Sequence, residues 1–250
     1  MTVAGQAEAF SLEGLPAEIR WLETTDSTNS YLRSLPSSHD TRIALSWNQT
    51  AGRGRHGRFW VSPPGESLAV SIDLGHLVPE NMSDTWRGAV SLLVAAELAR
   101  SIHATISLPA VVKWPNDVLI GGKKVAGILG EIPEPGRVIV GIGINVWGSP
   151  NELFGSTATS LSAHGLSETG RFEEVVADFL QSALSRLSHI RLSVSTADFA
   201  FVKTHLSTLG HQVRALLPNG YEISGLAEDI DSLGRLLVTT GSSRQVISAG

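Results

Sequence analysis

Residues 52–60 combine cationic side chains with glycines, and a stretch of this kind is suited to binding an anion. The stretch reads Gly-Arg-Gly-Arg-His-Gly-Arg-Phe-Trp. Glycine has no Cβ atom, so backbone N–H groups and neighbouring arginine side chains can converge on one negative charge. Phe59 and Trp60 follow directly and are suited to packing against a flat ring. A ligand that has both a phosphate and a flat ring would fit this stretch, so the sequence predicts a nucleotide ligand. The alternative is a solvated basic turn.

The three glycines match the pattern G-x-G-x-x-G, but their surroundings exclude the standard nucleotide-binding motifs. The dinucleotide fingerprint requires a helix that begins at the third glycine. Residues 62–65 read Ser-Pro-Pro-Gly and cannot begin one. The sequence contains neither the protein-kinase motifs H-R-D and D-F-G nor the phosphate loop G-x-x-x-x-G-K-S/T. The basic loop must therefore act together with residues from elsewhere in the chain.

Two strand-like stretches contain residues that a plain sheet does not need. Lys113 lies within the apolar run 110–120, where it faces either solvent or a cleft whose anion compensates its desolvation. Pro115 restricts this run to a sheet edge or a bulge. Residues 141–145 read Gly-Ile-Gly-Ile-Asn, so one face of the strand lacks side chains, and Gly127 can do the same one strand over. Such glycines admit either a ligand or a closely packed helix.

A polar segment, residues 24–29, precedes the apolar residues of a short helix that Pro36 ends. Capping of the helix uses one or two of these side chains. The others can line a pocket as neutral hydrogen-bond donors and acceptors.

Composition limits the classes of protein that the chain can represent. With 250 residues, 42% of them hydrophobic and 17% charged, it can bury a full core. A net charge of −5 argues against wholesale nucleic-acid binding. The lack of cysteine excludes thiolate metal sites, and the scattered histidines give no metal-binding pair. Residues 1–8 lack the pattern of a secretion signal and the longest apolar run, 89–96, is too short to span a bilayer, so we expect a cytoplasmic protein.

The order of predicted elements indicates an α+β fold with a mixed, largely antiparallel sheet packed with helices. Apolar alternation and turn signals predict strands at 19–23, 43–47, 67–74, 110–120, 123–132 and 137–146, the last three forming an antiparallel meander. Helical spacing predicts helices at 84–103, 171–190 and 198–206. From residue 210 onward only short strands are predicted, at 213–217, 221–230, 235–240 and 245–248. We therefore expect a flexible stub (1–18), a main domain (19–207) and a small β-barrel (208–250).

Five motifs occur in the order found in biotin protein ligases, and the chain resembles that family over residues 20–250. They are D-S-T-N at 26–29, Q-T-A-G-R-G-R at 49–55, K-W-P-N-D at 113–117, K-V-A-G-I-L at 124–129 and G-I-G-I-N at 141–145. The resemblance implies the catalytic fold shared by class II synthetases and biotin/lipoate ligases, with a C-terminal SH3-like β-barrel. It also implies two reactions. Biotin and ATP give biotinyl-5′-AMP and pyrophosphate, and a lysine of a biotin carboxyl carrier protein domain of acetyl-CoA/acyl-CoA carboxylase then accepts the biotin.

The resemblance assigns roles to residues by their place in these motifs. The residues implied to bind biotin are Ser27, Thr28, Asn29, Gln49, Gly52, Arg53, Arg55, Lys113 and Gly127. Those implied to bind ATP are Arg55, Arg58, Trp60, Lys113, Asn116 and Asn145. Arg55 and Lys113 are implied to be catalytic, and the charges suit that role because a carboxylate and a phosphate repel each other. Mg²⁺ is expected on the ATP phosphates, with no protein ligand assigned to it.

Three departures from the family pattern shape what we expect of this chain. The segment before Trp21 is too short for the DNA-binding domain of dual-function members, so we expect a monofunctional ligase that binds no DNA. His56 stands where some members have arginine, which lowers the charge of the loop at neutral pH. The chain ends at Gly250, so we expect a barrel shortened at its last strand. We also expect no membrane association, and a monomer or weak homodimer.

Two other functions remain open at this point. A lipoate-type ligase has the same fold but usually lacks the arginine-rich loop, and the acid that yields an acyl adenylate distinguishes the two. A single-stranded nucleic-acid-binding module would use the three arginines for phosphates, with Phe59 and Trp60 stacking on bases. Salt-dependent retention on single-stranded DNA would indicate that module.

Overall fold

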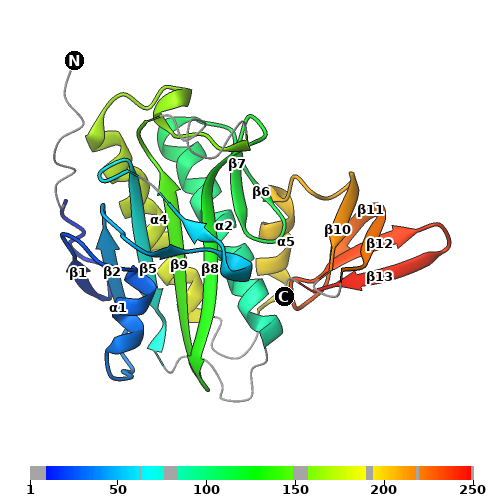
Figure 1. The fold of residues 1–250 in the computed structure, drawn as a ribbon, viewed down its shortest axis with the longest axis horizontal. Helices are drawn as coiled ribbons and strands as arrows, with labels where there is room; N and C mark the ends of the chain where they lie inside the picture. The colour runs from blue at the N-terminus through cyan, green and yellow to red at the C-terminus, as the bar shows by residue number, and fades with distance from the viewer. Residues whose placement is uncertain are drawn as a thin grey trace.

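A seven-stranded sheet forms the centre of the protein, in the order β1-β2-β5-β9-β8-β7-β6 (Figure 1). The computed structural model describes residues 10–61, 63–75, 84–148, 157–189, 194–217 and 220–248, with side chains left undescribed at 84–86 and 189. The strands are β1 (Glu18–Trp21), β2 (Arg42–Ser46), β5 (Ser67–Asp73), β6 (Ala110–Lys113), β7 (Asp117–Ile120), β8 (Lys123–Glu134) and β9 (Arg137–Asn145). The β1–β2 pair is parallel and the other neighbours are antiparallel. The predicted mixed, largely antiparallel sheet is confirmed.

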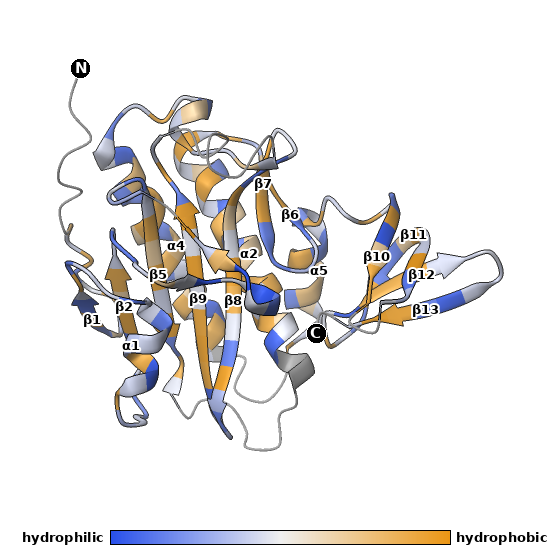
Figure 2. Ribbon diagram, in the orientation of Figure 1, coloured by the Kyte–Doolittle hydropathy of each residue, from blue (hydrophilic) through white to orange (hydrophobic). Residues whose placement is uncertain are grey.

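Helices cover both faces of this sheet. The helices α2 (Asp84–Ile106) and α4 (Thr169–His189) pack on one face, and the short α5 (Thr196–His205) lies against α2 (Figure 1). The short helix α1 (Thr28–Ser34) packs on β2, β5 and β9 at the opposite face. The central strands and α2 are mostly apolar, as their orange colour in Figure 2 shows. The main core therefore lies between the sheet and the α2–α4 layer.

Strand β5 is more buried than its alternating sequence predicts. Alternation of apolar and polar residues indicates a half-buried strand, but all seven residues of β5 are buried. Leu68, Val70 and Ile72 belong to the main core. The side chain of Ser71, on the polar face, contacts α1 instead of water. A polar strand face is thus covered by a helix that presents polar groups to it.

One helix in the described part of the chain has the length and composition of a membrane span. It is the Arg87–Ile106 stretch of α2, and 72% of its apolar window is buried inside the protein. The same apolar residues contact the sheet, α4 and α5. In this fold α2 is the central core helix.

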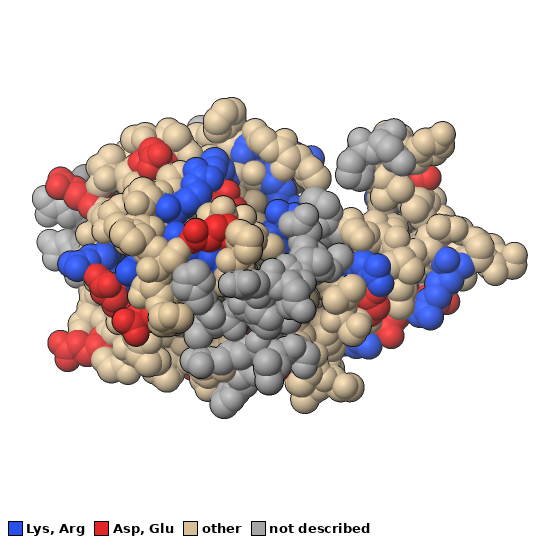
Figure 3. Space-filling model, turned by 90° about the horizontal axis from the view of Figure 1, so that it is seen from below, with Lys and Arg blue, Asp and Glu red and all other residues tan. Residues whose placement is uncertain are grey.

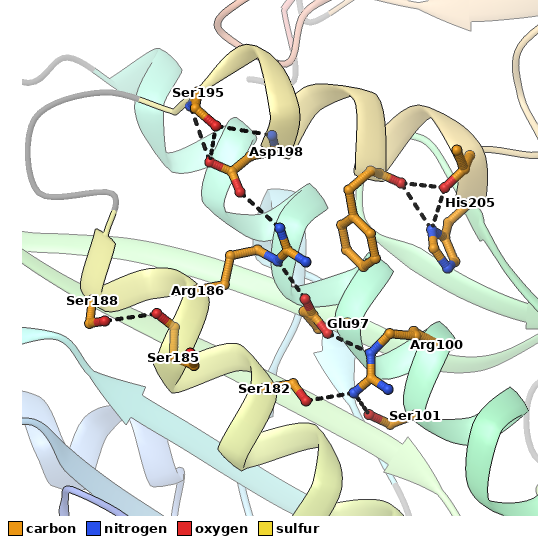
Figure 4. Close-up of polar contacts among 12 residues, drawn as sticks. Glu97, Arg100, Ser101, Ser182, Ser185, Arg186, Ser188, Ser195, Asp198 and His205 are labelled. Atoms are coloured by element: carbon orange, nitrogen blue, oxygen red, sulfur yellow. Dashed lines mark hydrogen bonds and ion pairs between the residues drawn. The ribbon is translucent and has the colours of Figure 1, made fainter.

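A buried carboxylate joins the three helices of this layer (Figure 4). Glu97 of α2 has a side chain only 2% exposed, and it accepts hydrogen bonds from Arg100 of α2 and Arg186 of α4. Arg186 also donates to Asp198 of α5, at 2.9 Å, and Arg100 to Asp178 of α4, at 2.8 Å. Because each charge has a hydrogen-bonded partner, the network fixes the helices without leaving a buried ion uncompensated.

The predicted strand 110–120 is wrong in one respect. The chain forms two strands here, β6 and β7, which pair with Lys113 opposite Asp117. Pro115 cannot donate a ladder hydrogen bond, so the run turns at residues 114–116 rather than continuing as one bulged strand. The K-W-P-N-D motif therefore occupies a tight turn at the end of a hairpin.

The expected flexible stub is also not what the structure shows for residues 10–17. Phe10 and Leu12 are buried in the main core, and the Phe10 ring meets Trp21 edge-on at a centroid distance of 5.0 Å. Apolar side chains in this segment can bury against the sheet, and this gain outweighs the entropy of ordering it. Residues 1–9 of the predicted stub lie outside the described residues.

A second, four-stranded antiparallel sheet follows at the C-terminal end. Its strands are β10 (Gln212–Leu216), β11 (Glu222–Ile230), β12 (Leu236–Thr240) and β13 (Ser243–Ile247), paired in this order. We call this sheet the C-terminal module; it stands where the SH3-like barrel is predicted. The indole Nε1 of Trp114 donates to Gly234 O at 2.9 Å, and the Trp114 backbone N–H donates to Thr208 at 2.8 Å. The β6–β7 turn thereby attaches the module to the main sheet.

An ion pair with almost no solvent exposure holds the end of α1 on the sheet. The Arg137 and Asp73 side chains are 3% and 1% exposed, and their atoms Nη2 and Oδ2 are 2.7 Å apart. Arg137 also donates to the carbonyl oxygens of Leu32, in the last turn of α1, and of Leu35, the residue directly after the helix. Burial alone would lower the pKa of Arg137, but its hydrogen bonds to Asp73 and the charge of that carboxylate raise it. The pair both compensates two buried charges and caps the helix.

Replacing Arg137 with methionine should strongly destabilise the protein, because Asp73 would keep a buried negative charge with no counter-charge. We expect the free energy of unfolding to fall by about 3–5 kcal/mol, the usual cost of removing one partner of a buried pair. Urea unfolding followed by circular dichroism measures it. The matched control is Arg20→Met, which removes an arginine whose side chain is 60% exposed and should cost under about 1 kcal/mol. Equal effects of the two changes would contradict the role given to Arg137.

Candidate active site

A cavity of about 640 Å³ lies where the main sheet, the basic loop and the C-terminal module meet. We call it the main cavity. Its walls come from the start of α1, the loop that follows β2, the β6–β7 turn, the middle of β8 and β9, and β10. Segments far apart in the sequence therefore supply its lining.

The basic loop is a short hairpin that crosses in front of β8 and β9 (Figure 1). Strand β3 (Gly52–Arg53) pairs with β4 (Phe59–Trp60), and the 3-10 turn η1 (Arg55–Gly57) connects them. The turn requires a left-handed backbone at two residues, His56 with φ 56° and Gly57 with φ 70°. The hairpin contributes Arg53, Arg55 and Arg58 to the lining of the main cavity.

Neutral polar side chains form the wall at the start of α1. Gln49 Oε1 accepts hydrogen bonds from the Thr28 backbone N–H, at 2.8 Å, and from its hydroxyl, at 3.1 Å. The Ser71 hydroxyl lies 2.7 Å from Thr28 Oγ1 and 2.6 Å from Asn29 Oδ1. Ser27 caps α1 by accepting from the Ser30 backbone N–H. These contacts fix the orientation of each amide and hydroxyl before any ligand is present.

A carboxylate that the sequence analysis missed connects this wall to the basic hairpin. Glu131 Oε2 of β8 accepts from Asn29 Nδ2 at 2.7 Å and from Arg53 Nη2 at 3.3 Å. Arg53 also donates to the Ser30 hydroxyl at 3.1 Å. The Arg53 guanidinium is thus held by protein groups from α1 and β8, and its position ties the base of the hairpin to the sheet.

The glycines of β9 and β8 admit protein side chains in this structure. A Cβ atom at Gly141 would overlap the Asn29 amide, and one at Gly143 would overlap the Trp60 ring. A Cβ atom at Gly127 would lie 2.9 Å from Lys124 Cε and 3.1 Å from the Trp60 ring. The lack of side chains on this strand face allows the Trp60 ring to lie close to the sheet, so the hairpin packs on the glycines.

The β6–β7 turn contributes charge beside the hairpin. Lys113 is exposed and lines the main cavity. Asn116 donates to Ile128 O at 2.7 Å and accepts from Arg55 Nη1 at 3.4 Å. Asp117 pairs with Lys124 at 2.6 Å, whose ammonium lies 5.5 Å from the centroid of the Trp60 ring. Asn116 and Lys124 therefore link the turn to the hairpin.

Arg55 is held in an environment that disfavours its charge. Burial, and next the positive charge of Arg87, lower the pKa of Arg55; Arg58 adds to the effect and Asp117 opposes it. Seen from below in Figure 3, blue Lys and Arg side chains gather toward the upper part of the face with a few red carboxylates among them. An anion that approached Arg55 would relieve this repulsion.

Most of the residues predicted for the site meet at the main cavity. Those that line it are Ser27, Thr28, Asn29, Gln49, Arg53, Arg55, Arg58, Trp60, Lys113, Asn116 and Gly127. Gly52 is buried behind the lining, where a Cβ atom would press against Gln49 Nε2 at 2.9 Å. Asn145 is buried in the sheet, accepting from Ser67 at 3.1 Å and donating to Thr159 O at 3.1 Å. The structure does not bring these two residues to the cavity surface.

Four residues near the cavity were missed by the sequence analysis. They are Ser71, Asp117, Lys124 and Glu131, each bonded to a predicted site residue or to another of the four. Asp117 and Lys124 belong to motifs already recognised, so the sequence carried a signal for them. Ser71 and Glu131 could be found only once the strand register was known.

Comparison with known proteins agrees with this arrangement. The family model for the biotin/lipoate A/B protein ligase family matches residues 21–148, and that for the biotin protein ligase C-terminal domain matches residues 208–250. A biotin--[acetyl-CoA-carboxylase] ligase of Mycobacterium tuberculosis is 34% identical over 232 residues, covering 90% of this chain and 85% of that protein. A protein with the same description from Paracoccus denitrificans is 34% identical over 242 residues, covering 91% and 97%.

A solved structure has the same fold. The biotin protein ligase from Aquifex aeolicus, in complex with biotin and ATP, superimposes with a TM-score of 0.79 at 27% identity, covering 93% of this chain and 96% of that one. The chain belongs to the biotin/lipoate A/B protein ligase family. Within that family its relatives above are biotin ligases, so the resemblance predicted from the five motifs is confirmed.

Replacing Gly143 with alanine should unseat the hairpin, because the added methyl group overlaps the Trp60 ring. Overpacking of this kind costs about 1–3 kcal/mol. If the free energy needed to open the hairpin falls by about 1 kcal/mol, the open form becomes roughly fivefold more populated and is cleaved that much faster. Limited trypsin digestion at the hairpin arginines measures it. The matched control is Gly170→Ala in α4, where an added Cβ meets nothing within 4 Å. Equal cleavage of the two variants would show that Trp60 does not hold the hairpin.

Proposed function

We propose that this chain activates biotin with ATP, giving biotinyl-5′-AMP and pyrophosphate, and then transfers biotin to a lysine of a carboxyl carrier protein domain. The observation that carries the proposal is the pairing of two kinds of lining in one cavity. Neutral, pre-oriented polar groups stand at the start of α1, and cationic groups stand at the hairpin and the β6–β7 turn. The relatives named as biotin--[acetyl-CoA-carboxylase] ligases support the same substrate and partner.

The first reaction joins two anions, and the charges of the cavity suit that step. A biotin carboxylate oxygen attacks the α-phosphorus of ATP, a bond from this oxygen to phosphorus forms, and the bond to the β-phosphate oxygen breaks. In our assignment Arg55 and Lys113 contact both reacting groups and offset their repulsion, while Arg58, Trp60 and Asn116 contact the nucleotide. In the described part of the chain the Lys113 side chain makes no ion pair or hydrogen bond, and its exposed ammonium is available to a ligand. Charge arranged in advance costs little reorganisation when the transition state forms.

The biotin end of the cavity suits a neutral, polar ring. The ureido group of biotin offers two N–H donors and one carbonyl acceptor, which match the amides and hydroxyls of Thr28, Asn29 and Gln49. We place Ser27, Gly127 and the hairpin base, residues 52–53, around the same ligand. Since the Arg53 guanidinium is held by Glu131 and Ser30, its part is to position the hairpin backbone rather than to meet biotin directly.

The second reaction transfers biotin to an amine. The deprotonated lysine nitrogen of the carrier attacks the carbonyl carbon of the mixed anhydride, an amide bond forms, AMP leaves, and the nitrogen loses its remaining extra proton. The carrier lysine must reach the cavity for this step, and we place its approach beside the C-terminal module, which supplies part of the lining. We assign residues 19–207 to catalysis and 208–250 to this accessory module.

Mg²⁺ enters our proposal as the counter-ion of the ATP phosphates and thus as part of the substrate. Among the described residues no group of three His, Cys, Asp or Glu side chains could hold a resident metal ion. We further propose a cytoplasmic enzyme, a monomer or weak homodimer that acts on the carrier protein and binds neither DNA nor membrane.

Incubation with biotin, labelled ATP and a biotin carrier domain tests the function. We expect a biotinyl adenylate and, with the carrier, a product that streptavidin detects. Lipoate in place of biotin should give no adenylate, because the hairpin and polar wall suit a compact ureido ring. Turnover of lipoate alone would overturn the proposal, as would retention on single-stranded DNA that biotin and ATP leave unchanged.

Replacing Lys113 with glutamine should slow adenylate formation by about 10²–10³-fold, the usual effect of removing one charged donor at a transition state. Stopped assays of the first half-reaction measure the rate. The matched control is Lys123→Gln at the start of β8, which removes the same charge from a residue outside the cavity lining. An unchanged rate in the Lys113 variant would remove this residue from the mechanism.

A further inference from the structure

A second cavity, of about 420 Å³, lies on the α2 side of the basic hairpin. We call it the rear cavity. The hairpin forms one wall, the first turns of α2 with Arg87, Gly88 and Ser91 form another, and β8 residues 128–131 form the floor. Arg53–Arg55 and Asn116 line both cavities, so the two cavities are neighbours with the hairpin as a shared wall.

Among the described residues, those that line the rear cavity carry more positive than negative charge. Its lining includes Arg55 and Arg58 from the hairpin and Arg87 from α2. Glu131 is the one carboxylate among the described lining residues, and it already accepts hydrogen bonds from Asn29 and Arg53. The charge of Arg87 lowers the pKa of Arg55, second only to burial as a cause. A multiply charged anion would reduce this repulsion more than a singly charged one.

The position of Arg87 is built into the packing of α2 against the sheet. A Cβ atom at Gly130 of β8 would lie 2.7 Å from Arg87 Cγ and 2.9 Å from Ser91 Oγ. The lack of a side chain at Gly130 therefore lets the stem of Arg87 cross the strand closely. Ser91 donates to Arg87 O at 2.8 Å, which fixes the same turn of the helix. Arg87 belongs to none of the five sequence motifs.

We propose that the rear cavity binds the pyrophosphate released in the first reaction, with Arg87 as a binding residue for it. The inference rests on the proposed function. Displacement at the α-phosphorus is in line, so the entering carboxylate and the departing pyrophosphate lie on opposite sides of that atom. We place biotin in the main cavity and the α-phosphate at Arg55. The departing pyrophosphate takes the electron pair of the broken P–O bond. It then faces the rear cavity, the neighbouring cavity that is lined by arginines.

Exchange of labelled pyrophosphate into ATP in the presence of biotin tests the assignment, because this exchange requires pyrophosphate to bind in the reverse direction. Wild-type protein that shows no exchange would count against the proposed function itself. Given exchange, Arg87→Gln should raise the KM for pyrophosphate about tenfold or more, as for loss of a hydrogen bond to a charged group. The KM for biotin should change less than about twofold, because Arg87 does not line the main cavity.

Two further variants make the result specific to this residue. Arg87→Lys should restore part of the affinity for pyrophosphate, since it returns the charge without the planar fork. Arg20→Gln on β1 removes one positive charge far from both cavities and should leave both KM values unchanged. Isothermal titration with inorganic pyrophosphate alone provides a readout that does not depend on turnover. An unchanged pyrophosphate KM in Arg87→Gln, or an equal rise in the KM for biotin, would overturn the assignment.

Discussion

The repulsion between closely placed arginines is the constraint on which this structure depends. Arg55, Arg58 and Arg87 converge from a hairpin and a core helix, and burial together with the charge of Arg87 lowers the pKa of Arg55. Such an arrangement costs free energy in the folded protein, and it persists because the surrounding structure is rigid. The seven-stranded sheet, the buried Glu97 network and the Arg137–Asp73 pair supply that rigidity. The binding energy of a phosphate-bearing ligand is then available to offset the cost.

Neutral and charged parts of the site are coupled through a few side chains. Asn29 bonds to Ser71 on one side and to Glu131 on the other, and Glu131 also holds Arg53 at the base of the hairpin. Trp60 then seats the hairpin on the glycine face of the sheet. A polar ligand at the start of α1 and an anion at the hairpin therefore act on a single connected set of contacts.

Much of the fold and of the site could be predicted from the sequence, because short-range sequence patterns indicate the strands, the helices and the residues of the motifs. Alternation and helical spacing gave the meander, the helices and the C-terminal sheet, and the motifs gave the lining of the main cavity. The failures have physical causes. Pro115 lacks a backbone N–H for the strand ladder, so residues 110–120 form a hairpin instead of one strand. Burial of Phe10 orders a segment that we expected to be flexible. Glu131 and Arg87 carry no local signal, since their roles arise from a register and a helix packing that only the three-dimensional structure defines.

The attachment of the C-terminal module has a consequence of its own. Trp114 is bonded both to Gly234 and to Thr208, and its neighbours in the same tight turn are Lys113 and, two residues on, Asn116. The module is therefore fastened to the very segment that carries the exposed ammonium group. A displacement of the module would therefore be transmitted to this turn, and also to α5 through the Lys203–Asp229 ion pair at 2.7 Å. One turn thus supplies both a cation to the main cavity and two of the hydrogen bonds that hold the C-terminal end of the chain in place.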